Sequence, residues 1–172
     1  MSLLARLLGT RPDPREALRP LWHRVVEIAR EPQWYAKGGV ADTVAGRFDA
    51  ITLVLSLVML RMDGHETLKA PSARLTELFV DDMDGQLRQS GVGDLVVGKR
   101  MGKLVGALGG RIDALREALA KEGDAALVAA IERNVTLNEQ ADTAAIAAEL
   151  RVMAATLAAT SDEDLLAGRI VR

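Results

Sequence analysis

The sequence predicts an all-α protein: a single-domain, compact bundle of about six to seven helices with a central apolar helix, extending over residues 1–172. Three observations predict this class. Ala and Leu dominate an apolar fraction of 49%, aromatic residues make up only 3%, and Ala and Leu are strong helix formers. Apolar residues recur at three- and four-residue spacing in successive segments. Asp, Ser, Pro and Gly stand at the breaks between these segments, as is typical of helix ends.

The first two helices are predicted on either side of a loop. A helix over 13–30 is favoured by an Asp-Pro start and by its apolar spacing, with Pro20 delaying the regular part. Pro32 and Gly38-Gly39 predict the loop that follows. The second helix, over 42–62, is apolar on both sides and therefore belongs in the centre of the domain.

The third and fourth helices are predicted from their end signals. Pro71-Ser72 opens the third helix, and Gly91 can take the left-handed conformation that ends it. Asp94 is expected to cap the fourth helix. Gly109-Gly110 is expected to interrupt that helix before a separate one over 111–122.

Two further helices and a final turn complete the bundle. Apolar stripes predict helices over 125–137 and 143–159, and Ser161 with Asp164 resembles a capping box that starts the last turn. The chain shows no fixed-period repeat and no low-complexity linker, so we expect one domain.

Charge and cysteine content exclude several classes of function. A net charge of −2 gives no bulk attraction to DNA, and the absence of cysteine rules out disulfides, thiolate metal sites and thiol nucleophiles. The apolar run 51–62 is shorter than the roughly 20 residues of a membrane span. The segment 1–9 contains an Arg and lacks the pattern of a secretory signal, so a cytoplasmic location is expected.

One segment resembles a phosphate-binding loop. Gly93 to Lys99 matches the first seven positions of that motif, in which glycine amides and a Lys cradle phosphates. Arg100 stands where a Ser or Thr should bind magnesium, and no strand is predicted before it. A helix start containing glycines is the favoured interpretation, and a nucleotide- or phosphate-binding protein is the alternative.

The remaining polar residues predict no catalytic site, metal or cofactor. His23 and His65 are isolated from each other, and no Ser lies on a turn beside a base. The acidic positions between 77 and 84 are consistent with the solvated face of a helix, on which Asp84 and Arg88 form an i,i+4 ion pair. We therefore expect a protein that is not an enzyme.

Glycines recur every four residues at Gly98, Gly102, Gly106 and Gly110. Glycine weakens a helix by about 1 kcal/mol relative to alanine, so the series calls for a reason. Close approach of a second helix is the physical candidate. Packing of another helix of the same domain is the favoured interpretation, and docking of an external helix is the alternative.

The same helix carries the densest basic cluster of the chain, at Lys99, Arg100 and Lys103. A solvated surface is the default interpretation. Phosphates of lipid headgroups or RNA are the functional alternative.

Three motifs together resemble the ubiquinol-cytochrome c chaperone family. They are Trp34-Tyr35, then Gly46-Arg47-Phe48-Asp49 leading into the apolar helix, then the run Phe79-Val-Asp-Asp-Met-Asp84-Gly-Gln-Leu-Arg88-Gln-Ser-Gly91-Val-Gly93-Asp94-Leu-Val-Val-Gly98-Lys99. The likeness covers roughly 18–120, and the Asp-Met-Asp to Gly-Lys run is its most specific part.

The resemblance implies a cofactor-free assembly factor. It would bind newly synthesised cytochrome b and promote assembly of the cytochrome bc1 complex, as a cytoplasmic protein or one peripheral to the cytoplasmic face of the inner membrane. The ribosome is a further candidate partner. A helical scaffold is the alternative, and the oligomeric state and the need for a small partner subunit stay open.

The candidate partner-binding residues combine positions that match the family pattern with the basic cluster. None is expected to be catalytic. They are Trp34, Tyr35, Phe48, Asp84, Arg88, Lys99, Arg100 and Lys103.

Overall fold

The computed structural model describes residues 13–89 and 94–171, with the side chains of 94–97 excepted. Within these ranges it contains seven α-helices and no strand, apart from an isolated bridge between Val40 and Leu137, which confirms the predicted all-α bundle. The elements are η1 (Glu16–Leu18), α2 (Arg19–Ala29), η2 (Gln33–Lys37), α3 (Val44–Met62), η3 (Glu66–Leu68), α4 (Lys69–Gln89), α5 (Asp94–Leu119), α6 (Ala125–Asn134), α7 (Thr143–Ala159) and α8 (Asp162–Leu166).

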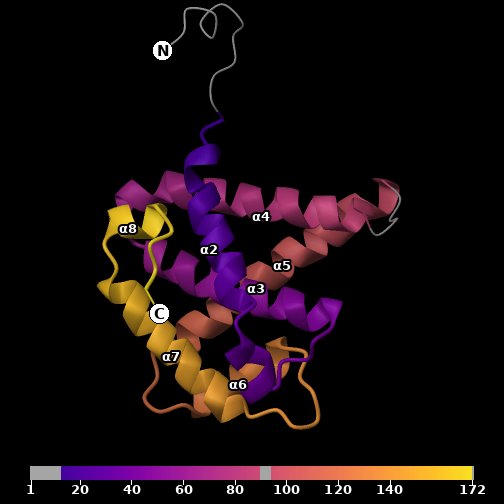
Figure 1. Cartoon of the computed structure of the whole chain (residues 1–172), viewed down its shortest axis with the longest axis vertical. Coiled ribbons are helices and arrows are strands. Elements are labelled where there is room, and N and C mark those ends of the chain that lie inside the picture. The colour runs from indigo at the N-terminus through magenta and orange to yellow at the C-terminus, as the bar shows by residue number, and fades with distance from the viewer. Residues whose placement is uncertain (1–12, 90–93, 172) are drawn as a thin grey trace, which may run out of the picture.

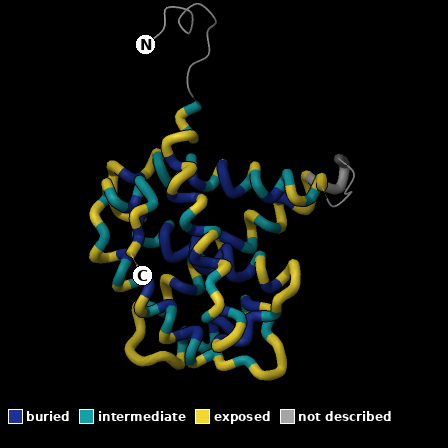
Figure 2. The backbone as a smooth tube through the Cα atoms, viewed as in Figure 1, coloured by how far each residue is buried: buried dark blue, intermediate teal, exposed yellow. Residues whose placement is uncertain are grey.

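Helix α3 forms the centre of the bundle, as its all-round apolar pattern predicts. It contacts α2, α5 and α7, and α4 lies across one end of the molecule while α6 lies at the other (Figure 1). Its two buried hydroxyl groups are satisfied within the helix: Thr52 donates to the Phe48 carbonyl at 3.0 Å, and Ser56 donates to the Thr52 carbonyl at 2.6 Å. Most residues of α3 are buried, and buried residues are concentrated in the middle of the molecule (Figure 2).

Arginines on α2 and α3 tie the C-terminal part of the chain to the bundle. The Arg61 guanidinium donates to the carbonyls of Leu157 and Thr160 at 3.0 and 2.9 Å, satisfying groups at the end of α7. Arg24 donates to the Ile170 carbonyl at 3.0 Å. At Gly168, with φ +71°, an added Cβ would lie 2.6 Å from the Pro20 carbonyl oxygen, so only glycine allows this close contact.

Several predicted helix starts differ from the structure. Asp13 accepts bonds from Arg15 instead of capping a long helix, and regular α2 begins at Arg19 with Pro20 in its first turn. Helix α3 begins at Val44, two residues after the predicted start at 42, and Thr43 caps it by accepting from the Gly46 amide at 3.2 Å. The third predicted helix begins two residues earlier, at Lys69. The first turn of a helix tolerates proline because its amides have no partner within the helix.

The predicted break at Gly109-Gly110 is wrong, because α5 is continuous from Asp94 to Leu119. Buried Met101, Leu108 and Leu115 lie at helical spacing on both sides of the glycine pair. Their packing outweighs the intrinsic penalty of two glycines, which is about 2 kcal/mol.

Helix α6 ends at Asn134, three residues before the predicted end at 137. Val135 has extended backbone, and the Thr136 carbonyl accepts from the Ala41 amide at 2.9 Å, so tertiary pairing ends the helix. Helix α7 has the predicted bounds, and Ser161 caps α8 by accepting from the Asp164 amide at 3.1 Å. The expected caps at Gly91 and Asp94 fall outside the described residues and side chains.

Candidate binding surface on α5

The two family-pattern aromatics of the first loop contribute to the core rather than to an open surface. Trp34 is 1% exposed, and its indole Nε1 donates to the Ile28 carbonyl at 2.7 Å. The half-buried Tyr35 hydroxyl donates to the Ala29 carbonyl at 2.8 Å, and burial raises its pKa. Both side chains therefore fix η2 against the end of α2.

Phe48 also has mainly a packing role. Its partly buried ring lies 6.3 Å from the ring of Phe79, measured between centroids, and 5.3 Å from the guanidinium carbon of Arg111. The Gly46 that precedes it in the motif lets the Ala41 carbonyl approach α3, because a Cβ at that position would collide with this oxygen. The Gly-Arg-Phe-Asp motif is thus explained largely by the fold.

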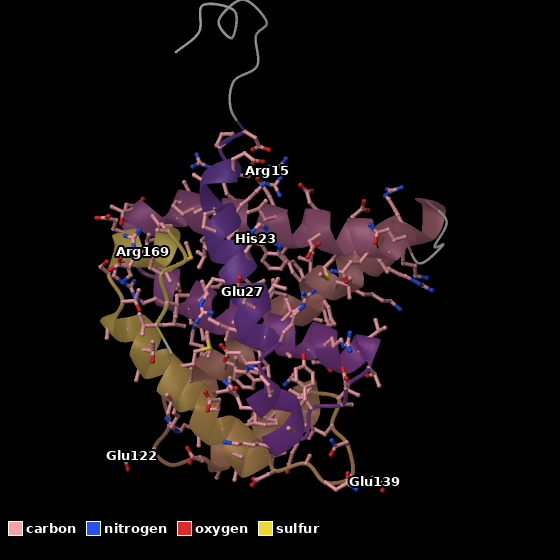
Figure 3. All side chains as sticks on the ribbon, in the orientation of Figure 1. Arg15, His23, Glu27, Glu122, Glu139 and Arg169 are labelled. Carbon is pink, nitrogen blue, oxygen red and sulfur yellow. The ribbon has the colours of Figure 1, made fainter. Side chains whose placement is uncertain are left out.

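The acidic face of α4 is solvated and paired with arginines. Asp84 and Arg88 form the predicted i,i+4 pair at 2.6 Å. Arg15, which immediately precedes η1, forms an ion pair with Asp81 at 2.5 Å. Arg15 is labelled in Figure 3 beside α4. Its hydrogen bonds also lower the pKa of Asp13 to about 2. No group of three or more His, Asp or Glu among the described residues is placed to bind a metal.

A groove of about 540 Å³ separates α2 from α4. Trp22, Val26 and Leu78 provide its apolar lining, while arginines and carboxylates line its sides. His23 and Glu27 lie along it on α2 (Figure 3). Its charges are of both signs, so it gives no strong preference for one class of ligand.

The basic cluster forms an exposed turn near the start of α5, which we call the basic turn: Lys99, Arg100 and Lys103. None of the three has an ion-pair partner within 13–89 or 94–171. The basic turn lies where α4 and α5 meet, whereas η2 lies toward α6 at the other end of the molecule (Figure 1). The structure therefore does not bring the basic turn together with Trp34 and Tyr35.

The glycines of α5 face open space. A Cβ built at Gly98, Gly102, Gly106, Gly109 or Gly110 would have no heavy atom from outside its own helix segment within 4 Å. The favoured prediction, that another helix of the same domain packs on this series, is wrong for the described residues, because the buried side of α5 is the opposite one. We call this surface the α5 face: Gly98, Gly102, Val105, Gly106, Gly109 and Gly110.

The α5 face leads to a pocket of about 380 Å³ between α5 and the end of α6. Gly110 and Arg111 line it from α5, and Arg133 and Thr136 line it from the other side. Asp49 of α3 lies at its base, with its carboxylate in contact with Arg111 and accepting from the Thr136 amide and hydroxyl, both at 2.7 Å.

Arg111 is the buried centre of this arrangement. Its terminal nitrogens donate to Asp49, to the Thr52 hydroxyl and, at 2.6 Å, to the Asn134 carbonyl. The side chain is 10% exposed, and its Nε has no hydrogen-bond partner. We call these contacts the Asp49–Arg111 clasp, and they join α3, α5 and the segment after α6. Sequence reasoning missed it, although a charged residue within the apolar stripe of a helix was an available signal.

The segment that resembles a phosphate-binding loop has different local structure. Asp94 to Lys99 lie in α5, and the described element before them is helix α4 instead of a strand. Because these residues are helical, the extended loop that wraps around phosphates in the motif is not formed there. Gly93 lies outside the described residues.

Comparison with known proteins now identifies the family. A family model described as ubiquinol-cytochrome C chaperone matches residues 36–172, which is most of the chain. The chain belongs to the ubiquinol-cytochrome c chaperone family. The resemblance inferred from the three motifs is therefore confirmed.

A solved structure supports the same family at the level of the fold. This ubiquinol-cytochrome c chaperone family member is similar to the crystal structure of the Cbp3 homolog from Brucella abortus, with 32% sequence identity and a TM-score of 0.79. The similarity covers 98% of this chain and 95% of the Brucella chain. No curated protein matches the sequence.

Proposed function

We propose that the protein is an assembly chaperone that binds newly synthesised cytochrome b and promotes formation of the cytochrome bc1 complex. The single observation that carries this proposal is the family match over residues 36–172. The near-complete likeness to the Brucella Cbp3 homolog supports it, because the agreement extends over 98% of the chain rather than over one motif.

The physical features of the chain fit a protein that acts by binding. No described helix is long and apolar enough to span a membrane. We propose the cytoplasmic face of the inner membrane as the site of action, because the chaperone would meet its client there as the client is made. Exposed helix backbone on α5 and unpaired cations beside it supply a surface for such contact.

A deletion strain tests this function. Without the protein, we expect newly made cytochrome b to be unstable and the level of assembled bc1 complex to fall, and a plasmid-borne copy should restore both. The measurements are immunoblotting of cytochrome b and ubiquinol–cytochrome c reductase activity in membranes. Normal amounts of both in the deletion strain would contradict the proposal.

A further inference from the structure

We propose that the α5 face is the client-docking surface, and that its occupant is one apolar α-helix of the client that carries an acidic side chain opposite Lys99 and Lys103. This inference rests on the proposed chaperone function and names the part of the molecule that performs it. Four features of α5 support it.

The first feature is the open space above the glycines. Glycine in the middle of a helix is unfavourable relative to alanine, and the described structure contains no internal contact that requires it at Gly98, Gly102 or Gly106. A Cβ at any of these positions would be accommodated by the fold. The described chain therefore gives no packing reason for glycine at these positions, whereas a closely packed partner helix would give one.

The second feature is the shape of the surface. Residues 98–110 of a helix extend about 18 Å at about 1.5 Å per residue, and the glycines follow the centre of the exposed side. Small residues at four-residue spacing allow two helix backbones to approach closely. Val105, which is 39% exposed at one edge, offers an apolar contact to the incoming helix. A helix of three to four turns fits this surface.

The third feature is charge. Lys99 and Lys103 are four residues apart and lie side by side along the other edge of the α5 face. Their ammonium groups have no ion-pair partner in the described parts of the chain, so an acidic side chain of the client would be complementary. A lipid surface is less well matched, because electrostatic membrane binding uses clusters of about four to eight cations, and the glycines present no side chains for insertion.

The fourth feature is the pocket at the far end of the α5 face. Gly110 and Arg111 line it, and Arg111, nine-tenths buried, has an Nε donor without a hydrogen-bond partner. Arg133 lines the opposite side and has no ion-pair partner among the described residues. The end of a helix exposes carbonyl oxygens that lack partners within that helix. Such an oxygen of the client would meet the Arg133 guanidinium here.

The decisive variant fills the α5 face without disturbing the fold. Gly102→Leu combined with Gly106→Leu places two large side chains into space that the described chain leaves empty. Gly85→Leu on α4 is the matched control, because its Cβ also meets no atom within 4 Å. We expect both proteins to melt no lower than the parent.

The readout is photo-crosslinking to cytochrome b and bc1 content in the deletion strain. With a photoreactive residue at Val105, the double Leu variant should form at least about tenfold less cytochrome b adduct than the parent, because overpacking removes close contact. It should also fail to restore bc1, whereas the Gly85→Leu control should restore it. Charge reversal at Lys99 and Lys103 should reduce the adduct, and reversal at the exposed Lys121 should leave it unchanged.

The outcomes separate this inference from the proposed function. If bc1 depends on the protein but the double Leu variant restores it fully, the docking surface is wrong and the function stands. If bc1 does not depend on the protein, the function itself is wrong. Adducts from Val105 to a second copy of the chain or to lipid, in place of cytochrome b, would also overturn the docking surface.

Discussion

Replacing Asp49 with Asn should strongly destabilise the protein, because Asp49 balances the buried charge of Arg111. The carboxylate is 8% exposed and accepts from Arg111 and from the Thr136 amide and hydroxyl. Asn has only one acceptor oxygen, so its NH2 group would face a donor of Arg111 or Thr136 that the carboxylate now satisfies. The Arg111 guanidinium would also lose its counter-charge. Breaking a buried pair on one side costs about 3–5 kcal/mol.

The assay is urea and thermal unfolding followed by circular dichroism. A loss of this size corresponds to a fall in Tm of roughly 6–20 °C for a protein of this length. Asp42→Asn is the matched control, because Asp42 pairs with Arg47 at the surface, where both side chains are more than 60% exposed. Its effect should stay below about 1 kcal/mol. Equal effects of the two substitutions would refute the role assigned to the clasp.

A double substitution tests whether the Asp49–Arg111 pair acts as one unit. Asp49→Leu with Arg111→Met replaces both charges with apolar groups of similar size. Desolvation offsets much of the attraction within a buried ion pair. The double variant should therefore lose about 1–3 kcal/mol less free energy of unfolding than the two single variants lose in sum. Strict additivity would show that the two side chains act independently.

Three further predictions concern stability. Gly102→Ala and Gly106→Ala should each raise the free energy of unfolding by up to about 1 kcal/mol, because Cβ atoms there meet no neighbour. A lower Tm for either variant would contradict the finding that the α5 face is open. Trp34→Ala should cost about 3–5 kcal/mol through loss of a buried ring; an unchanged urea midpoint would show that the indole is not structural. The hydrogen bond from Arg61 lowers the pKa of Asp162 from its ordinary value of 3.8. The Arg61–Asp162 pair therefore stabilises the fold at pH values above 3.8. This contribution is lost as the pH falls through the lower pKa that Asp162 has in the folded state. The Tm difference between the parent and Asp162→Asn should therefore be constant from pH 7 to about pH 5 and shrink below pH 4, and a difference that grows on acidification would contradict the assigned sign.

The positions of most helices could be predicted from the sequence because their burial pattern is local. Apolar residues at three- and four-residue spacing mark α3 and α7, and Ser161 marks the start of α8. Helix α5 shows where local signals fail. Its glycine pair is typical of a break, but tertiary packing of Leu108 and Leu115 keeps the helix continuous.

The candidate site could be predicted only in part. The basic turn and the glycine series were visible in the sequence, because both depend on spacing within one helix. Which side of α5 is buried depends on neighbouring helices, so the choice between internal packing and external docking required the structure. The Asp49–Arg111 clasp joins residues 62 positions apart, and no local pattern pairs them. The burial of Trp34 likewise depends on a contact with the end of α2.

The central claim is that this family member binds cytochrome b during its synthesis. Pulse-labelling of cells that carry an affinity-tagged copy, followed by purification at intervals during a chase, tests it most directly. Labelled cytochrome b should co-purify immediately after the pulse and leave the tagged protein as the bc1 complex forms. Recovery of no labelled cytochrome b above the untagged control, at any time in the chase, would contradict the account.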